Sequence, residues 1–69
     1  MDLLWEDGFR IRVKIYKHEA TISANREGLL SLANQLSVLA EEAPGSHIHF
    51  DQYNSLEDGS VELIIEKTD

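Results

Sequence analysis

The sequence lacks cysteine altogether and contains no long apolar run. Without cysteine there are no disulfides, thiolate metal sites or thiol nucleophiles, and the chain suits a reducing compartment. A membrane helix needs about 20 consecutive apolar residues, and no stretch approaches that length. The opening segment Met1–Trp5 has neither the basic region nor the long apolar region of a signal peptide. We therefore expect a cytoplasmic protein that does not use a membrane.

Basic residues are scarce after the first third of the chain. Up to Arg26 there are five basic and four acidic residues, whereas from Glu27 onward there are nine acidic residues and a single basic one, Lys67. The formal net charge is −7. Such a surface disfavours nucleic acid, whose phosphates require Lys and Arg, and favours a basic protein partner. Acidity also keeps a small protein soluble, and both explanations stay open.

The length permits one domain, residues 1–69, with no room for a second core. A hydrophobic fraction of 42% is adequate for a folded chain. At this size most regularly spaced apolar residues are needed for the core.

One helix is predicted from Asn25 to Gly45. Asn25 is a favourable N-cap, and Pro44 with Gly45 would stop the helix. The core-facing residues expected at helical spacing are Leu29, Leu32, Ala33, Leu36, Leu39, Ala40 and Ala43.

The opposite helical face carries no charge, which is unusual for a surface helix. It is formed by Ser31, Asn34, Gln35 and Val38. One interpretation is an ordinary exposed face; the other is a partner contact, because interface cores are depleted in Lys and Glu. Glu41 and Glu42 follow at the C-terminal end, where the helix dipole disfavours acidic side chains.

Alternating apolar and polar residues predict four strands. We expect the second of them to point Ala20 and Ile22 toward the core. The order β-β-α-β-β predicts an α+β fold of two layers, with one helix packed on a mostly antiparallel sheet. If the first and last strands were neighbours, their basic and acidic outer faces would form cross-strand pairs. The predicted strands are Phe9–Tyr16, Glu19–Ser23, His47–Tyr53 and Ser60–Lys67.

The third predicted strand carries the only plausible chemical constellation, His47, His49 and Asp51, whose side chains share one face of a strand. Two imidazoles and a carboxylate can bind zinc or a non-haem metal. The simpler interpretation is a polar outer face, because an exposed strand lacks the pocket and supporting shell of a metal site. No nucleophile elbow or phosphate-binding glycine spacing is present, so we expect no enzyme. Trp5, Tyr16 and Tyr53 fit core or core-edge positions, or binding hot spots.

Three stretches carry a family resemblance. Asn25–Leu29 reads N-R-E-G-L and is followed by the pairs Leu32-Ala33 and Leu39-Ala40. Gly45–Asp51 reads G-S-H-I-H-F-D, and Leu56–Ile65 reads L-E-D-G-S-V-E-L-I-I. These stretches are similar to the N-x-E-G-L … L-A … L-A, G-x-H-x-H-x-D and L-x-x-G-S-x-x-L-x-I runs of immunity protein family 32.

This resemblance covers residues 25–67 of the 69. It implies a small α+β protein of a bacterial polymorphic toxin system that binds a cognate toxin, made by the same cell, and blocks it. It does not imply an enzyme, and we expect no cofactor. The acidic half of the chain suits a basic toxin, but neither the toxin's identity nor the oligomeric state, monomer or homodimer, follows from the sequence.

Candidate toxin contacts follow from the predicted outer sheet face and the acidic helix end. Two alternatives remain open: a small metal-binding protein that uses the His-x-His-x-Asp row, and a generic interaction module or self-associating dimer with an exposed Ile64. The candidate contacts are His47, His49, Asp51, Glu62 and Glu66 on the sheet, with Glu41 and Glu42 beside the helix end.

Overall fold

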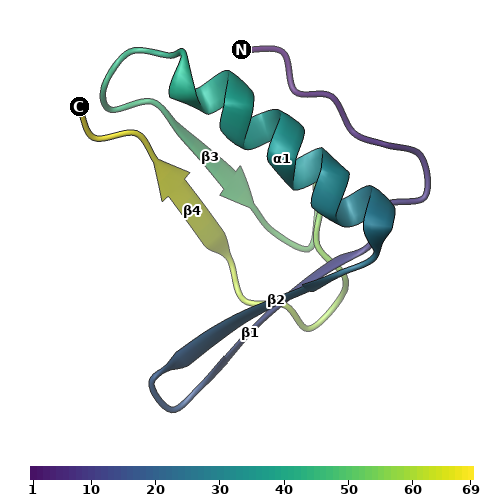
Figure 1. The fold of residues 1–69 in the computed structure, drawn as a ribbon. Helices are drawn as coiled ribbons and strands as arrows, with labels where there is room; N and C mark the ends of the chain where they lie inside the picture. Colours follow the sequence, from purple (N-terminus) through teal and green to yellow (C-terminus); the bar gives the residue numbers. More distant parts are fainter.

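The computed structural model describes all 69 residues and contains one helix and four strands in the order β-β-α-β-β (Figure 1). The helix lies across one side of the molecule, and the strands form the other layer. The predicted α+β class and element order are therefore confirmed. The elements are β1 (Ile11–Tyr16), β2 (Glu19–Ala24), α1 (Arg26–Ala40), β3 (His47–Phe50) and β4 (Leu63–Glu66).

The strand layer consists of two antiparallel hairpins, β1–β2 and β3–β4, rather than one continuous sheet. The segment from Glu57 to Val61, which we call the connecting segment, links the two hairpins because it runs along the free edge of β1. The amide of Glu57 donates to the carbonyl of Ile11 (2.9 Å), and the amide of Val61 donates to that of Val13 (3.0 Å). This arrangement satisfies one strand edge without a third regular strand.

The strand order considered from the sequence, with the first and last strands as neighbours, does not occur, since β4 pairs only with β3. The basic face of β1 instead forms an ion pair with the connecting segment. The guanidinium of Arg12 lies 2.8 Å from the carboxylate of Glu57. Both side chains are partly exposed, so this pair contributes modestly to stability.

The core lies where α1 crosses the inner faces of both hairpins. Phe50 and Ile11 are its most buried large side chains, and Trp5 packs edge-on against Phe50 with ring centroids 6.2 Å apart. The buried apolar residues are Ile11, Val13, Leu32, Leu39, Ile48, Phe50 and Leu56.

The N-terminal end of the helix is as predicted. The side-chain oxygen of Asn25 accepts a hydrogen bond from the amide of Gly28 at 2.8 Å, and also from the amide of Arg10 at 2.9 Å. The C-terminal end differs, because α1 stops at Ala40 rather than near Gly45. The Glu41 amide already bonds the carbonyl three residues back, so the chain leaves the helix in a tight turn.

The helix is rotated relative to the prediction. Ser31 and Gln35, expected on the outer face, are fully buried, whereas Leu29 and Leu36, expected in the core, are exposed. The residues before β1 explain this rotation, because they pack along the Ser31 side of α1. The amide of Glu6 donates to the Ser31 hydroxyl at 2.8 Å, and the Gln35 amide group donates to the carbonyl of Leu4 at 3.2 Å. Neither Ser31 nor Gln35 can therefore contact a partner.

The far end of the β1–β2 hairpin extends beyond the helix (Figure 1). The expectation that Ala20 and Ile22 face the core is wrong: both are exposed, as is Ile15. These three residues share the apolar face of the hairpin with Ile11 and Val13. The helix α1 covers only one end of that face, the end at which β2 leads into the helix.

Three of the four strands are shorter than predicted. β1 starts at Ile11 rather than Phe9, β3 ends at Phe50 rather than Tyr53, and β4 runs from Leu63 to Glu66 rather than from Ser60 to Lys67. β2 is one residue longer than predicted and ends at Ala24. The residues lost from β3 and β4 form turns and the connecting segment. The single helix falls short of the length and apolar character that crossing a membrane requires.

Candidate functional site

Four of the predicted contact residues lie on one exposed face of the β3–β4 hairpin. The antiparallel register places His47 opposite Glu66 and His49 opposite Ile64, and Glu62 comes just before β4. Ile64 is 52% exposed although it is a large aliphatic residue. We call His47, His49, Glu62, Ile64 and Glu66 the hairpin face.

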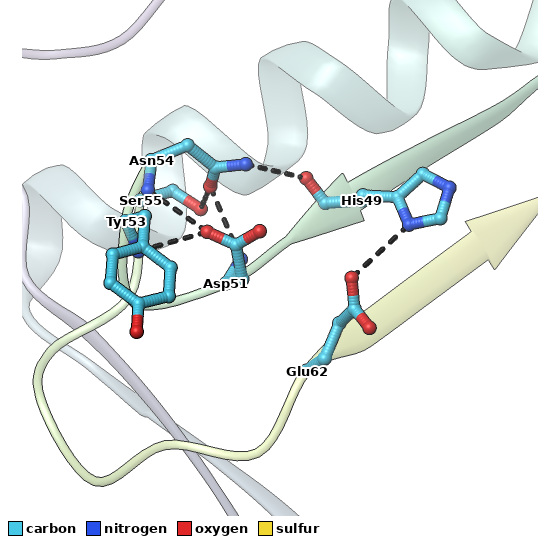
Figure 2. A network of polar contacts seen from close by, with 6 residues as sticks. All are labelled: His49, Asp51, Tyr53, Asn54, Ser55 and Glu62. Carbon is cyan, nitrogen blue, oxygen red and sulfur yellow. Dashed lines mark hydrogen bonds and ion pairs between the residues drawn. The ribbon is translucent and has the colours of Figure 1, made fainter.

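Polar contacts order the two histidines on this face. The Nδ1 atom of His49 lies 3.2 Å from a carboxylate oxygen of Glu62 (Figure 2). His47 contacts the carbonyl oxygen of Gly45 through its own Nδ1 at 3.1 Å. The two imidazole rings meet edge to face, with centroids 4.9 Å apart. The face therefore presents two adjacent imidazoles with a carboxylate beside them.

Asp51 does not continue the histidine row, because β3 has already ended at Phe50. Its carboxylate closes a turn instead: Oδ1 accepts hydrogen bonds from the amides of Tyr53 (2.8 Å) and Asn54 (3.0 Å) (Figure 2). The Asp51 carbonyl accepts from the amide of Leu56 at 2.8 Å. Since Leu56 is a core residue, Asp51 shapes the loop that delivers it to the core.

Asn54 ties this turn back to the hairpin face. Its amide group donates to the backbone carbonyl of His49 at 3.1 Å, and its side-chain oxygen contacts the hydroxyl of Ser55 (Figure 2). The same oxygen accepts from the amide of Asp51 at 3.2 Å. The turn after β3 and the histidines before it therefore form one hydrogen-bonded unit.

The geometry does not support the metal-site interpretation. No group of three or more His, Cys, Asp or Glu side chains is arranged so that it could hold a metal ion. His47 and His49 are adjacent, but Asp51 lies in the turn after β3, where its Oδ1 atom accepts hydrogen bonds from two backbone amides. The third ligand that the sequence suggested is thus committed to the turn.

Glu41 and Glu42 lie at the C-terminal end of α1, close to where the chain emerges from β4. Lys67 makes this connection: its ammonium group donates to the carbonyl of Glu42 at 2.8 Å, while its backbone pairs with Ser46 beside His47. Both acidic residues therefore sit at the end of the molecule where Glu66 pairs with His47.

Tyr53, for which the sequence left open a core-edge position or a binding hot spot, is a surface residue. Its side chain is 89% exposed. It borders a shallow hollow of about 280 Å³ lined by Asp51, Gln52, Tyr53, Ser60 and Glu62. The signal for exposure was the polar D-Q-Y-N-S run around it, which is typical of a turn.

The other two aromatic candidates, Trp5 and Tyr16, differ in burial. Trp5 is partly buried and stacks on Phe9, with centroids 4.7 Å apart, so it is a core-edge residue as expected. Tyr16 is exposed at the end of β1, beside the turn into β2, and so belongs to the other hairpin.

Comparison with known proteins agrees with the sequence motifs. No curated protein and no solved structure matches the chain significantly. The family model described as Immunity protein 32 matches residues 19–68, a span that runs from β2 through α1 and both strands of the hairpin face. Since this match covers well over half of the chain, the protein belongs to the Immunity protein 32 family.

Proposed function

We propose that this protein binds a cognate toxin of a bacterial polymorphic toxin system and neutralises it by stoichiometric contact. The family match carries this proposal. The protein acts without catalysis, by covering the toxin's active site or a surface that the toxin needs. The absence of cysteine suits action in a reducing cytoplasm.

The toxin contacts the hairpin face and the neighbouring Tyr53. This surface combines an exposed aliphatic residue, Ile64, with an exposed aromatic one and two imidazoles. Aromatic anchors supply much of the binding energy in protein interfaces. Glu62 and Glu66 add negative charge, as do Glu41 and Glu42 at the same end of the molecule. The partner surface is therefore basic around an apolar centre.

Asp51 serves this surface indirectly in the proposal. Its carboxylate holds the backbone of Tyr53 and Asn54, and Asn54 in turn holds the His49 carbonyl. We assign Asp51 the role of positioning Tyr53 beside the hairpin face.

Co-expression with the toxin encoded beside this gene tests the proposal. The neighbouring reading frames are searched for a large protein with secretion and repeat regions and a variable C-terminal domain. That domain is expressed from an inducible promoter with and without this chain. We expect growth to be restored, and the two proteins to co-purify in a fixed stoichiometric ratio.

Growth arrest that this protein does not relieve, with no complex on co-purification, would overturn the proposal for that toxin. A locus of unrelated metabolic genes would also count against it. Because inhibition by contact requires stoichiometric amounts, protection should fall as the toxin is expressed in excess over this protein.

A further inference from the structure

The rotation of α1 leaves an apolar face of the helix uncovered. Leu29 is 55% exposed, Leu36 45% and Leu30 37%, and Ala33 and Ala40 are exposed beside them. The residues before β1 cover the Ser31 side of the helix and do not protect this face. An exposed apolar face on so small a protein is characteristic of an interaction surface.

Charges stand only at the two ends of this face. No charged residue occurs in α1 after Glu27. Arg26, Leu30, Ala33, Ser37 and Glu41 follow one another at three- and four-residue steps, so they form one row along the helix. All five are exposed. The row therefore begins with a positive charge, ends with a negative one and has its smallest side chain, an alanine, at the centre.

We propose that this helical face docks against the same face of a second copy, with the two helices antiparallel. A two-fold axis beside Ala33 places Arg26 of each copy opposite Glu41 of the other. The longer Leu30 side chain then faces the short Ser37 of the second copy. Antiparallel helices also bring opposite dipole ends together. The contact is isologous, as in most homodimers.

The charge order favours a second copy over a different protein as the occupant. A basic partner would be favoured by acidic residues at both ends of the face, but one end carries Arg26. Reversing the direction of an identical helix matches both ends at once. Opposite charges across the rim of an interface set its register and suppress other alignments.

The expected dimer is weak. A 15-residue helix is about 22 Å long, and one helical face buries less than the roughly 800 Å² per partner of standard complexes. Each copy also carries a formal charge of −7, which opposes association. We therefore expect a monomer–dimer equilibrium with a Kd in the micromolar range, separate from toxin binding on the hairpin face.

Sedimentation equilibrium over a wide concentration range tests the dimer. Leu36→Glu should leave the protein monomeric at concentrations where the wild type dimerises. Ile64→Glu is the matched control, because it places the same charge on an aliphatic residue of similar exposure outside α1. Its dimerisation should equal that of the wild type. A wild-type protein that stays monomeric throughout, or a dimer that only Ile64→Glu abolishes, would overturn the proposal.

A charge swap tests the antiparallel arrangement. Arg26→Glu and Glu41→Arg should each weaken dimerisation about tenfold or more, because each sets like charges opposite one another. The double variant should recover wild-type dimerisation. Arg26→Glu places a negative charge at the N-terminal end of α1, and Glu41→Arg places a positive charge at its C-terminal end. The helix dipole favours both changes, so a loss of dimer cannot be attributed to unfolding. A double variant no better than the single ones would rule out this pairing.

Discussion

The ammonium group of Lys67 lies 2.8 Å from the carbonyl oxygen of Ala40, the last residue of α1. It lies equally close to the carbonyl of Glu42. The last turn of α1 contains no basic residue, and two glutamates follow it. The only basic residue after Arg26 therefore supplies the positive charge that the helix dipole and its unpaired carbonyls favour.

Replacing Lys67 with Met should destabilise the protein. The substitution keeps the aliphatic length of the side chain but leaves two carbonyls without their donor. We expect a loss of about 1–2 kcal/mol in the free energy of unfolding, which lowers Tm by roughly 4–8 °C per kcal/mol in a domain of this size. Thermal denaturation followed by circular dichroism measures it. Lys67→Arg, which keeps the charge, should lose less, and an unchanged Tm in Lys67→Met would show that the contact is screened by solvent.

The order of elements could be predicted from the sequence because it depends on local patterns. Alternation identified the strands, and Asn25 marked the start of the helix. The buried face of α1 could not be predicted, because apolar residues recur on more than one side of it. What decides the face is the pair of contacts from Ser31 and Gln35 to backbone groups 25 and 31 residues earlier in the chain. Contacts between single side chains and a distant irregular segment have no periodicity to detect.

The hairpin face could be predicted from the sequence, because it depends on a local pattern, as the order of elements does. A period of two places His47 and His49 on one side of a strand, and the register brings Glu66 to the same side. Asp51 does not continue this alternation, because an Asp side chain accepts hydrogen bonds from nearby backbone amides and so closes turns. The turn that it forms exposes Tyr53, for which the sequence left open a core-edge position or a binding hot spot. The contact roles of these residues remain predictions.

Ser31→Ala should release the segment before β1 from the helix. The Ser31 hydroxyl accepts from the Glu6 amide and donates to the Glu27 carbonyl, both at 2.8 Å, so the alanine leaves the Glu6 donor unpaired. We expect a loss of about 1–2 kcal/mol. Trp5, the only tryptophan, adjoins Glu6, and its fluorescence should shift to longer wavelength in the native state. Chemical denaturation and emission spectra measure the two effects.

Ser37→Ala is the control for that change, because Ser37 lies exposed on the same helix. It should be neutral or slightly stabilising, as Ala has the higher helix propensity. Equal losses in the two variants would show that the buried hydroxyl has no special role.

Gly28→Ala should destabilise the protein, although Ala is normally preferred in helices by up to about 1 kcal/mol. A Cβ atom at Gly28 would lie 2.6 Å from the carbonyl oxygen of Arg10 and 3.0 Å from side-chain atoms of Ala24 and Ile11. The helix would have to move away from the β1–β2 hairpin, at a cost of about 1–3 kcal/mol. Urea denaturation checks the sign, and any gain in stability would contradict the close packing of α1 on the hairpin.

Reversing charge on the hairpin face should weaken protection against the toxin. The double variant Glu62→Lys/Glu66→Lys removes two negative charges from the proposed contact and adds two positive ones. Against a basic toxin we expect at least a tenfold loss of affinity, mainly through slower association at low salt. Surface plasmon resonance and the co-expression growth assay measure it. Glu19→Lys, at the exposed end of β2, should leave affinity nearly unchanged, and equal losses would indicate a general rather than a local charge effect.

Tyr53→Ala isolates the aromatic contribution to the same contact. At 89% exposure the Tyr53 ring has little packing to lose, and Asp51 binds only its backbone amide, so the Tm should stay within about 2 °C of the wild type. Toxin affinity should fall by more than tenfold if the ring is an anchor, since such residues carry about 2 kcal/mol or more. Tyr16→Ala is the matched control, because Tyr16 is 70% exposed on the other hairpin. Full toxin affinity in Tyr53→Ala, or a loss confined to Tyr16→Ala, would move the contact away from the hairpin face and toward the β1–β2 tip.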